Sequence, residues 1–238
     1  MEKTEIIIQK LVLQEPVTAL TDFIVTFLCI LFYFKLGKAE FVSRRNNLWR
    51  SFFLFVGLST LFGGIAHLLR FYLDGPVHKT IWLCMNFLSA ISVYFAELSA
   101  IEVVINKSKK KLVNLIALIL LVSFTALSLY TQNFNIAKVN MGIGLIFILI
   151  SHLITNRRGL EGSLYVVAGM SCSFIPVFIH SQKISLNKWF NFNDISHVFM
   201  MLSLYLIFLG VTAFNLNEGV EEDVEETIHN NSLSQSLH

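Results

Sequence analysis

Charged residues are scarce in this chain. Asp, Glu, Lys and Arg make up 14% of its 238 residues, whereas 55% are hydrophobic. A soluble domain contains about 25% charged residues, so the composition excludes an ordinary water-soluble fold and predicts a membrane protein. The net charge of +2 gives no support to nucleic-acid binding, and we expect the lipid bilayer to be the main partner.

Cysteine is also rare, since only Cys29, Cys84 and Cys172 occur. Each lies within a long apolar run rather than in a loop, which argues against the disulfide framework of a small secreted protein. We expect all three to be packing residues.

Long apolar stretches are what the sequence does contain. A spanning helix needs about 20 apolar residues, and seven of them leave about a hundred residues for loops and tails. Strands of a membrane barrel would show alternating polarity, whereas these runs are apolar on every side. The predicted fold is therefore all-α, an integral membrane bundle of seven transmembrane helices over residues 17–216, with spans at 17–36, 49–72, 80–105, 112–131, 138–155, 162–181 and 194–215.

The two ends of the chain differ from the predicted bundle. Residues 1–16 lack a secretory pattern, because acidic residues accompany Lys3 and the apolar cluster at 6–8 is too short for a signal core. We expect an interfacial segment there, followed by Pro16 as the first residue of a helix. Residues 217–238 carry six acidic residues and no Lys or Arg, which predicts an acidic, disordered tail.

Lys and Arg are distributed unequally between the two sides of this bundle. Eleven fall on the side that holds the loops near 35–50, 107–111 and 157–158, and six fall on the other side. Because basic residues concentrate in cytoplasmic loops, the N-terminus is predicted outside and the C-terminus in the cytoplasm.

Several polar residues fall inside the predicted spans. An ionisable residue at the bilayer centre costs about 2.5–3.5 kcal/mol on insertion scales, so each should face a partner or a cavity. Asp22 and His67 both lie about five residues from the outer boundary, roughly 8 Å deep. Polar residues of five helices are predicted to converge near the outer face: Glu15, Thr18, Asp22, His67, Arg70, Asn86, His180, Asp194 and His197, with Tyr205 deeper on the last helix. Glu97 lies deeper still and is expected to form a separate site with His152.

The order of these residues resembles the CREST superfamily of seven-helix membrane hydrolases, which includes alkaline ceramidases and the progestin and adipoQ receptors. Gly63-x-x-x-His67 occupies the position of a Ser-x-x-x-His motif on helix 2 of that superfamily, and Asp194-x-x-His197 that of a His-x-x-x-His motif on helix 7. Gly63 therefore replaces the Ser, and Met201 stands where the second His falls. The segments 15–22 and 193–197 also look like those of bacterial seven-helix proteins of unknown function. This second resemblance implies a protein of the bacterial cell (cytoplasmic) membrane.

The resemblance implies zinc as the cofactor. A catalytic zinc takes about three protein ligands plus a water and lowers the pKa of that water to about 7. His67, His197 and one carboxylate, Asp194 or Asp22, are the predicted ligands, and the remaining acid is expected to orient a His or act as a base. The hypothesis is a metal-dependent hydrolase of lipid amides or esters, with Glu15, Thr18, Arg70, Asn86, His180 and Tyr205 as binding residues.

Other interpretations stay open. The same cavity fits a receptor or sensor for a lipid or small ligand, and Asp22, His67, Asp194 and Glu97 fit the relay of a proton-linked carrier. A microbial rhodopsin is excluded because the last span has no Lys for a Schiff base. Structural roles are equally available: an Arg70–Asp74 ion pair, a helix-terminus acid at Glu15, and close helix packing at the Gly63–Gly64 pair.

Overall fold

Seven helical spans form the body of the molecule in the computed structural model, which describes residues 4–38 and 43–236, without the side chains of residues 134, 137 and 216–236. Each span is long and apolar enough to cross a membrane, which confirms the predicted all-helical, seven-span architecture. The helices are α1 (Pro16–Leu36), α2 (Arg44–Leu68), α3 (Gly75–Val104), α4 (Lys107–Thr131), α5 (Phe134–Arg157), α6 (Ser163–Cys172), α7 (Phe174–Gln182) and α8 (Phe192–Ser236).

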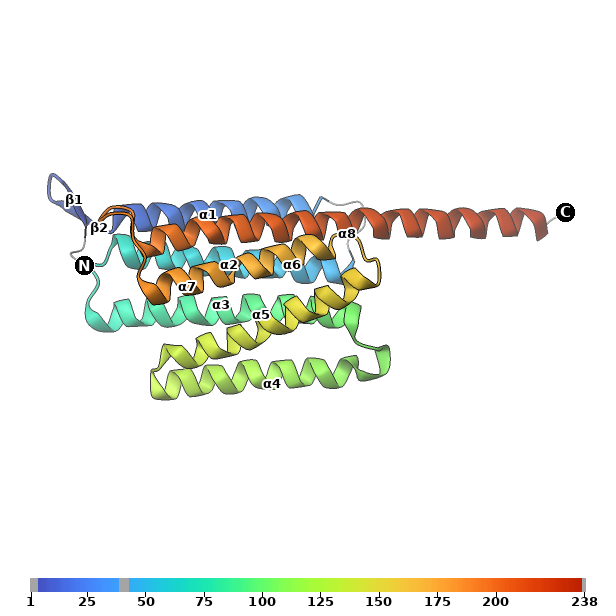
Figure 1. Cartoon of the computed structure of the whole chain (residues 1–238), viewed down its shortest axis with the longest axis horizontal. Helices are drawn as coiled ribbons and strands as arrows, with labels where there is room; N and C mark the ends of the chain where they lie inside the picture. The colour runs from blue at the N-terminus through green and yellow to red at the C-terminus, as the bar shows by residue number, and fades with distance from the viewer. Residues whose placement is uncertain (1–3, 39–42, 237–238) are drawn as a thin grey trace.

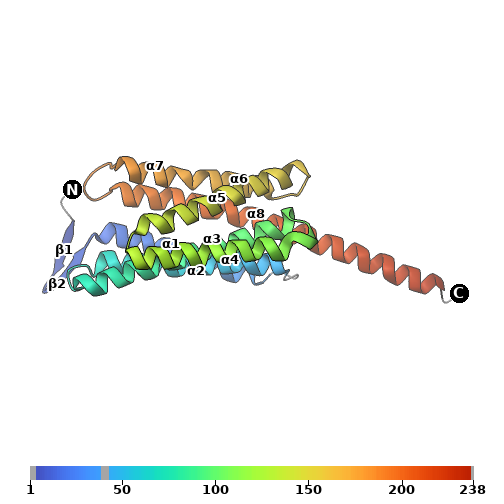
Figure 2. The ribbon, with the colours of Figure 1, turned by 90° about the horizontal axis from the view of Figure 1, so that it is seen from below.

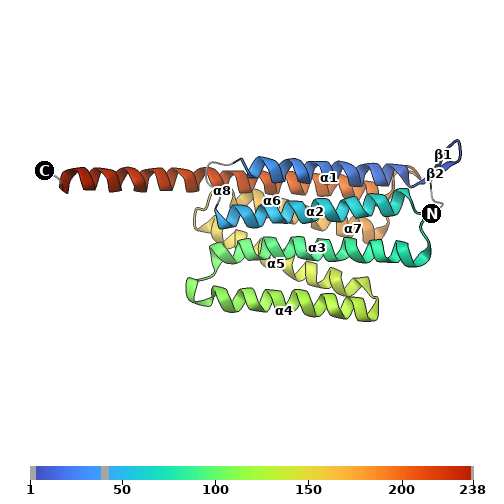
Figure 3. The same ribbon diagram turned by 180° about the vertical axis from the view of Figure 1, so that it is seen from behind.

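Six of the seven spans close into a ring. Figure 1 and Figure 3 show α1, α2, α3 and α4 lying side by side in sequence order. The ring continues from α3 to α5, α6, α8 and back to α1, and each neighbouring pair packs together. Helix α4 packs against α3 and α5 from outside the ring. The centre of the bundle is therefore surrounded by every span except the fourth.

The core of the ring is apolar and aromatic. Val25, Trp49, Phe53, Ile148 and Val211 are fully buried, whereas many large apolar side chains on the outer faces of the helices are exposed. A water-soluble bundle would carry charged residues on those outer faces. Their apolar character is what lipid-facing helices require.

The sixth span is broken into α6 and α7. Pro176 has no backbone N–H, so it cannot donate to the Cys172 carbonyl one turn earlier, and the helix divides at Ser173. The sequence predicts one unbroken helix over 162–181, so the break at Ser173 was not predicted.

Glycines allow α6 and α8 to pack very closely. Gly162 precedes α6 with φ +82°, and a methyl group on it would collide with the Gly210 carbonyl of α8. A methyl group on Gly169 would lie 2.8 Å from the Ser203 carbonyl of the same partner helix. The spacing between these two helices is thus set by residues without side chains.

A β-hairpin precedes the bundle, and it was not predicted from the sequence. Its strands are β1 (Glu5–Ile8) and β2 (Leu11–Gln14), paired antiparallel, with Gln9 at φ 56° in the turn. The Tyr72 hydroxyl accepts from Val12 N at 2.8 Å and so ties the hairpin to the loop between α2 and α3. We call the end of the bundle that carries this hairpin the hairpin end, and the opposite end the tail end; the interfacial location of residues 1–16 stays a prediction.

The last helix is much longer than its span. Its apolar part ends at Asn215, and its backbone continues as helix to Ser236, beyond the other helices (Figure 1). The acidic residues predicted as a disordered tail fall in this continuation, and residues 237–238 lie outside the described part. The predicted disorder of this segment stays a prediction.

Candidate functional site

Two histidine–carboxylate pairs lie at the hairpin end of the bundle. Glu15, the residue before α1, places Oε2 2.8 Å from Nδ1 of His67 on the last turn of α2. Asp22, on α1, places Oδ1 3.3 Å from Nε2 of His197 on α8. The side chains of the first two helices and of the last one thus meet, as expected from the sequence. We call Glu15, Asp22, His67, Asp194 and His197 the polar cluster.

Burial strengthens the electrostatic interactions between the residues of the polar cluster. Asp22 is 4% exposed and Asp194 is 0% exposed. Asp22 interacts electrostatically with His67 and Asp194, and His197 interacts with His67. Charges in such a low-dielectric environment interact several times more strongly than in water. Three carboxylates and two imidazoles share this space, so the cluster carries excess negative charge unless it binds protons or a cation.

Gly63 provides room for the Asp22 carboxylate. A methyl group at Gly63 would lie 3.1 Å from Asp22 Oδ2, a distance at which the carboxylate has to shift. Gly63 is therefore a contact residue of the polar cluster, in addition to being a packing residue.

His197 uses both of its ring nitrogens. Its Nδ1 lies 2.7 Å from the Thr21 hydroxyl, and that hydroxyl donates to the Thr18 carbonyl at 2.9 Å. The tautomer of His197 decides which group donates in the bond between Nδ1 and the Thr21 hydroxyl, and Nε2 faces Asp22. A neutral imidazole has one N–H, so His197 donates either to Thr21 or to Asp22 and needs a second proton to donate to both. The Asp22–His197 pair can therefore bind one further proton.

Asp194 caps the start of α8. Its Oδ2 accepts a hydrogen bond from Asn191 N at 2.7 Å, and Asn191 Oδ1 accepts from Asn193 N at 2.8 Å. These reciprocal bonds follow the capping-box pattern, in which an acid on the first turn bonds back to the residue before the helix. Asn191 also donates to the Thr18 hydroxyl at 3.4 Å. The local role of Asp194 is to fix the start of α8, three residues before His197.

Asp194→Ala is expected to lower the free energy of unfolding by about 1–2 kcal/mol, because α8 loses a cap. Asp194→Asn keeps an acceptor oxygen and should cost clearly less. Thermal unfolding of both variants in detergent measures the difference. An equal loss of stability in the two variants would mean that capping is not the reason for this carboxylate.

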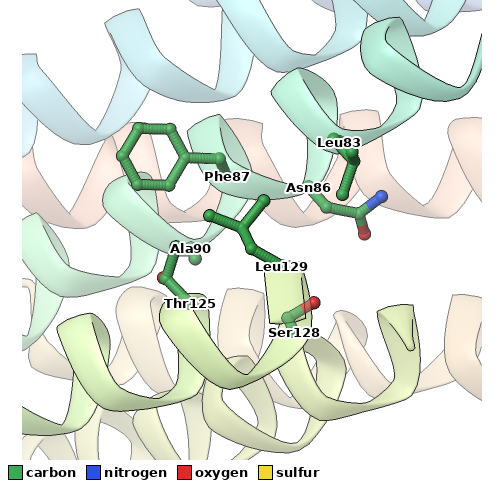
Figure 4. Close-up of a pocket in the computed structure, with 7 residues that line it drawn as sticks. All are labelled: Leu83, Asn86, Phe87, Ala90, Thr125, Ser128 and Leu129. Atoms are coloured by element: carbon green, nitrogen blue, oxygen red, sulfur yellow. The ribbon is translucent and has the colours of Figure 1, made fainter. Parts of the chain in front are cut away.

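Three of the predicted binding residues lie away from the polar cluster. Asn86 donates to the Trp82 carbonyl at 2.7 Å and lines a small pocket between α3 and α4 with Phe87 and Ser128 (Figure 4). The guanidinium of Arg70 donates to the Leu73 carbonyl at 3.1 Å, and Asp74 caps α3 by accepting from Val77 N, so each member of the expected ion pair has another partner. The Tyr205 ring packs 6.5 Å from that of Phe32, two turns beyond His197.

His180 and Thr18 lie at the edge of the polar cluster. The His180 ring packs edge-on against Phe192, 4.9 Å between centroids, and it interacts electrostatically with His197. Thr18 makes a side-chain hydrogen bond to Asp194 and also contacts Thr21 and Asn191. Thr21 and Asn191 hydrogen-bond directly to His197 and Asp194, and the sequence analysis missed them. Thr21 could have been found, because it directly precedes Asp22 and lies one turn from Thr18.

Glu97 and His152 do not form one site. Glu97 packs against Gly144 of α5, whereas His152 is stacked on Phe214 and lies near Trp49. Gly144 and His152 are eight residues apart on α5, about 12 Å at 1.5 Å per residue. A relay that joins Glu97 to His152 is therefore not formed by these contacts.

The predicted zinc ligands do not form a ready-made metal site in the described part of the chain. Among the residues whose side chains the structure describes, no group of three or more His, Cys, Asp and Glu is arranged to hold a metal ion. His197 has both nitrogens engaged, and His67 has only Nε2 left beside its bond to Glu15. A zinc ion could bind His197 only if His197 released Thr21 or Asp22. The reaction proposed for this site therefore uses no metal.

A cavity of about 190 Å³ lies next to the polar cluster, in the middle of the ring. Thr60 of α2 and Met200 of α8 line it. They are one helical turn from Gly63 and His197, or about 5 Å along their helices. The cavity therefore begins about one turn below the polar cluster.

Residues 17–216 match a family of unknown function, DUF6962. The chain belongs to that family. No curated protein matches the chain, and no solved structure does. The matched region of DUF6962 runs from the start of α1 to the end of the apolar part of α8. It includes the whole polar cluster except Glu15 and leaves out the hairpin and the acidic continuation of α8.

Proposed function

We propose that this protein is embedded in a bacterial cell membrane, with the hairpin end outside, and that it hydrolyses an ester or amide bond of a membrane lipid at the polar cluster. Seven apolar spans support the location. The excess of Lys and Arg in the loops of the tail end supports the orientation, because basic loops are retained in the cytoplasm. The site then lies in the outer leaflet, about 8 Å below its boundary.

The proton-binding pair of Asp22 and His197 is the observation that carries this proposal. A histidine held by a carboxylate on one side and by a hydroxyl on the other is oriented as a general base. The pair takes a proton from a water molecule as the water oxygen attacks the acyl carbon. The bond from that carbon to the leaving oxygen or nitrogen then breaks, and the leaving group receives the proton. The pair regains its starting state, and no redox partner is needed.

The test is product release from a panel of lipids. Purified protein in lipid nanodiscs is incubated with ester and amide lipids, and free acid is measured by mass spectrometry. We expect at least one class to be turned over by the wild type. Zinc is measured on the same sample. Stoichiometric zinc in the wild type that is lost in both His67→Ala and His197→Ala would mean that the hydrolysis uses zinc instead of the metal-free step. Absence of product from every lipid would overturn hydrolysis.

A receptor or sensor is the second candidate function, and the central cavity favours it. An apolar cavity of about 150 Å³ holds a benzene molecule in an engineered protein core, so this one is large enough for a ligand. A receptor binds such a ligand and changes conformation without turnover. Ligand-dependent protection from hydrogen exchange, with unchanged ligand recovered afterwards, distinguishes it from the hydrolase.

A further inference from the structure

Six hydroxyl side chains line the central cavity, and each of them is hydrogen-bonded within the protein. They come from α2, α3, α8 and the break between α6 and α7. Five of them have a backbone carbonyl as acceptor: Ser59 has Met85 at 2.9 Å, Thr60 has Val56 at 3.2 Å, Ser92 has Ser89 at 2.7 Å, and both Ser173 and Ser203 have Gly169, at 3.1 and 2.7 Å. Ser89 shares a 2.7 Å bond with Ser59. A hydroxyl has one proton, so these protons are used within the protein.

The remaining lining is apolar. It consists of aliphatic, aromatic and methionine side chains: Phe52, Val56, Val93, Met141, Leu145, Met170, Pro176, Met200, Leu204 and Ile207. A polar ligand such as a sugar would lose its hydrogen bonds to water in this cavity and would regain only part of them from the protein. That loss costs free energy. A hydrocarbon chain loses none. Methionine side chains also adapt to irregular shapes, as a flexible chain requires.

Helices α5 and α7 both contribute residues to the lining of the cavity. Helix α5 lies beside α4 at its first residues and beside α6 at its last, so it diverges from α7 toward the hairpin end (Figures 1 and 2). In the described part of the chain α5 packs on α3, α4 and α6, whereas α7 packs on α8 and α6. Met141 and Leu145 of α5 and Pro176 of α7 nevertheless line the same cavity. The two helices therefore border the cavity without packing on each other.

Large exposed side chains on α5 and α7 are apolar. Val139 and Ile143 on α5 are 54% and 45% exposed, and Val177 and Phe178 on α7 are both 60% exposed. Side chains of this kind border hydrocarbon in a spanning helix. A molecule that reaches the cavity between α5 and α7 therefore comes from the membrane interior rather than from water.

We infer that the central cavity binds one hydrocarbon chain of a membrane lipid, which enters sideways between α5 and α7. The chain end lies among Met170, Met200 and Leu204, and the linkage to the polar part lies about one turn higher, beside Asp22 and His197. The identity of that linkage rests on the proposed hydrolysis, whereas the chain site rests on the cavity alone.

A photoreactive lipid tests this inference. Phosphatidylcholine with a diazirine in the middle of one acyl chain is incorporated into nanodiscs with the full-length protein, irradiated, and the cross-linked peptides are mapped. Cross-links are expected on the cavity-lining methionines of α5, α6 and α8. Leu145→Trp fills the cavity and should reduce these cross-links about tenfold, the effect of about 1.4 kcal/mol on binding. Ile146→Trp, on the lipid-facing side of the same turn, is the matched control and should leave them unchanged.

The outcomes separate the two proposals. His197→Ala should keep the cavity cross-links, because the chain site does not use the imidazole. Cavity cross-links in a protein without hydrolytic activity would leave the chain site standing and remove the proposed hydrolysis. Cross-links confined to outward-facing residues, or an equal loss in the Leu145 and Ile146 variants, would overturn the chain site. Met141→Trp, also on the lining of the cavity, provides the same test if Leu145→Trp does not fold.

Discussion

His197→Ala is expected to reduce kcat for lipid hydrolysis by about 10²–10⁴-fold, the usual contribution of a positioned general base. Asp22→Asn should cause a loss of similar size, because the amide cannot share a proton with Nε2 of His197. The double variant should be little worse than either single one, since the two side chains act as a unit. Rates are measured on the best lipid of the panel, with substrate in excess.

Two controls accompany these variants. Tyr205→Phe removes one hydroxyl from α8 far from the polar cluster and should keep wild-type activity. Helical content and elution volume should be unchanged in all variants. Independent losses that multiply in the double variant would contradict the idea that Asp22 and His197 form one proton-binding pair.

Gly162→Ala is expected to destabilise the fold by about 2–5 kcal/mol. The positive φ costs an L-residue about 1–2 kcal/mol, and the collision of the new methyl group with the Gly210 carbonyl adds about 1–3 kcal/mol of overpacking. The substitution forces α6 away from α8, so the unfolding temperature should fall by several degrees. The measurement is thermal unfolding in detergent, followed by circular dichroism.

Gly159→Ala is the matched comparison for this effect. Gly159 has φ +80°, but a methyl group placed on it meets no atom within 4 Å. It should therefore cost only the conformational part, about 1–2 kcal/mol. Equal destabilisation by the two substitutions would show that close contact between α6 and α8 contributes nothing to stability.

The helical spans were predictable because lipid imposes a simple rule on the sequence. Every backbone group in an apolar segment must be satisfied internally, so length and hydropathy alone define the helices. The N-terminal hairpin follows no such rule. It depends on a turn at Gln9 and on the Tyr72 hydroxyl, a partner 60 positions away from Val12, and neither leaves a clear pattern in the sequence.

The polar cluster was predictable in outline and not in its hydrogen bonds. Depth along the helices was enough to bring Asp22 and His67 to one level and to place His197 nearer the same outer face, because each helix advances by a fixed 1.5 Å per residue. Rotation about the helix axis is decided by packing between helices. This is why Asn86, expected to face the cluster, faces α4 instead, and why the capping contact of Asp194 with Asn191 was not predicted.

The position of α4 outside the ring has a practical consequence. It supplies no residue to the central cavity or to the polar cluster, and Leu115 and Ile119 on its outward face are 52% and 53% exposed. A fluorophore or an epitope attached there reports on the protein without touching the chemistry. The fourth helix is accordingly the place to anchor probes for single-molecule or imaging work.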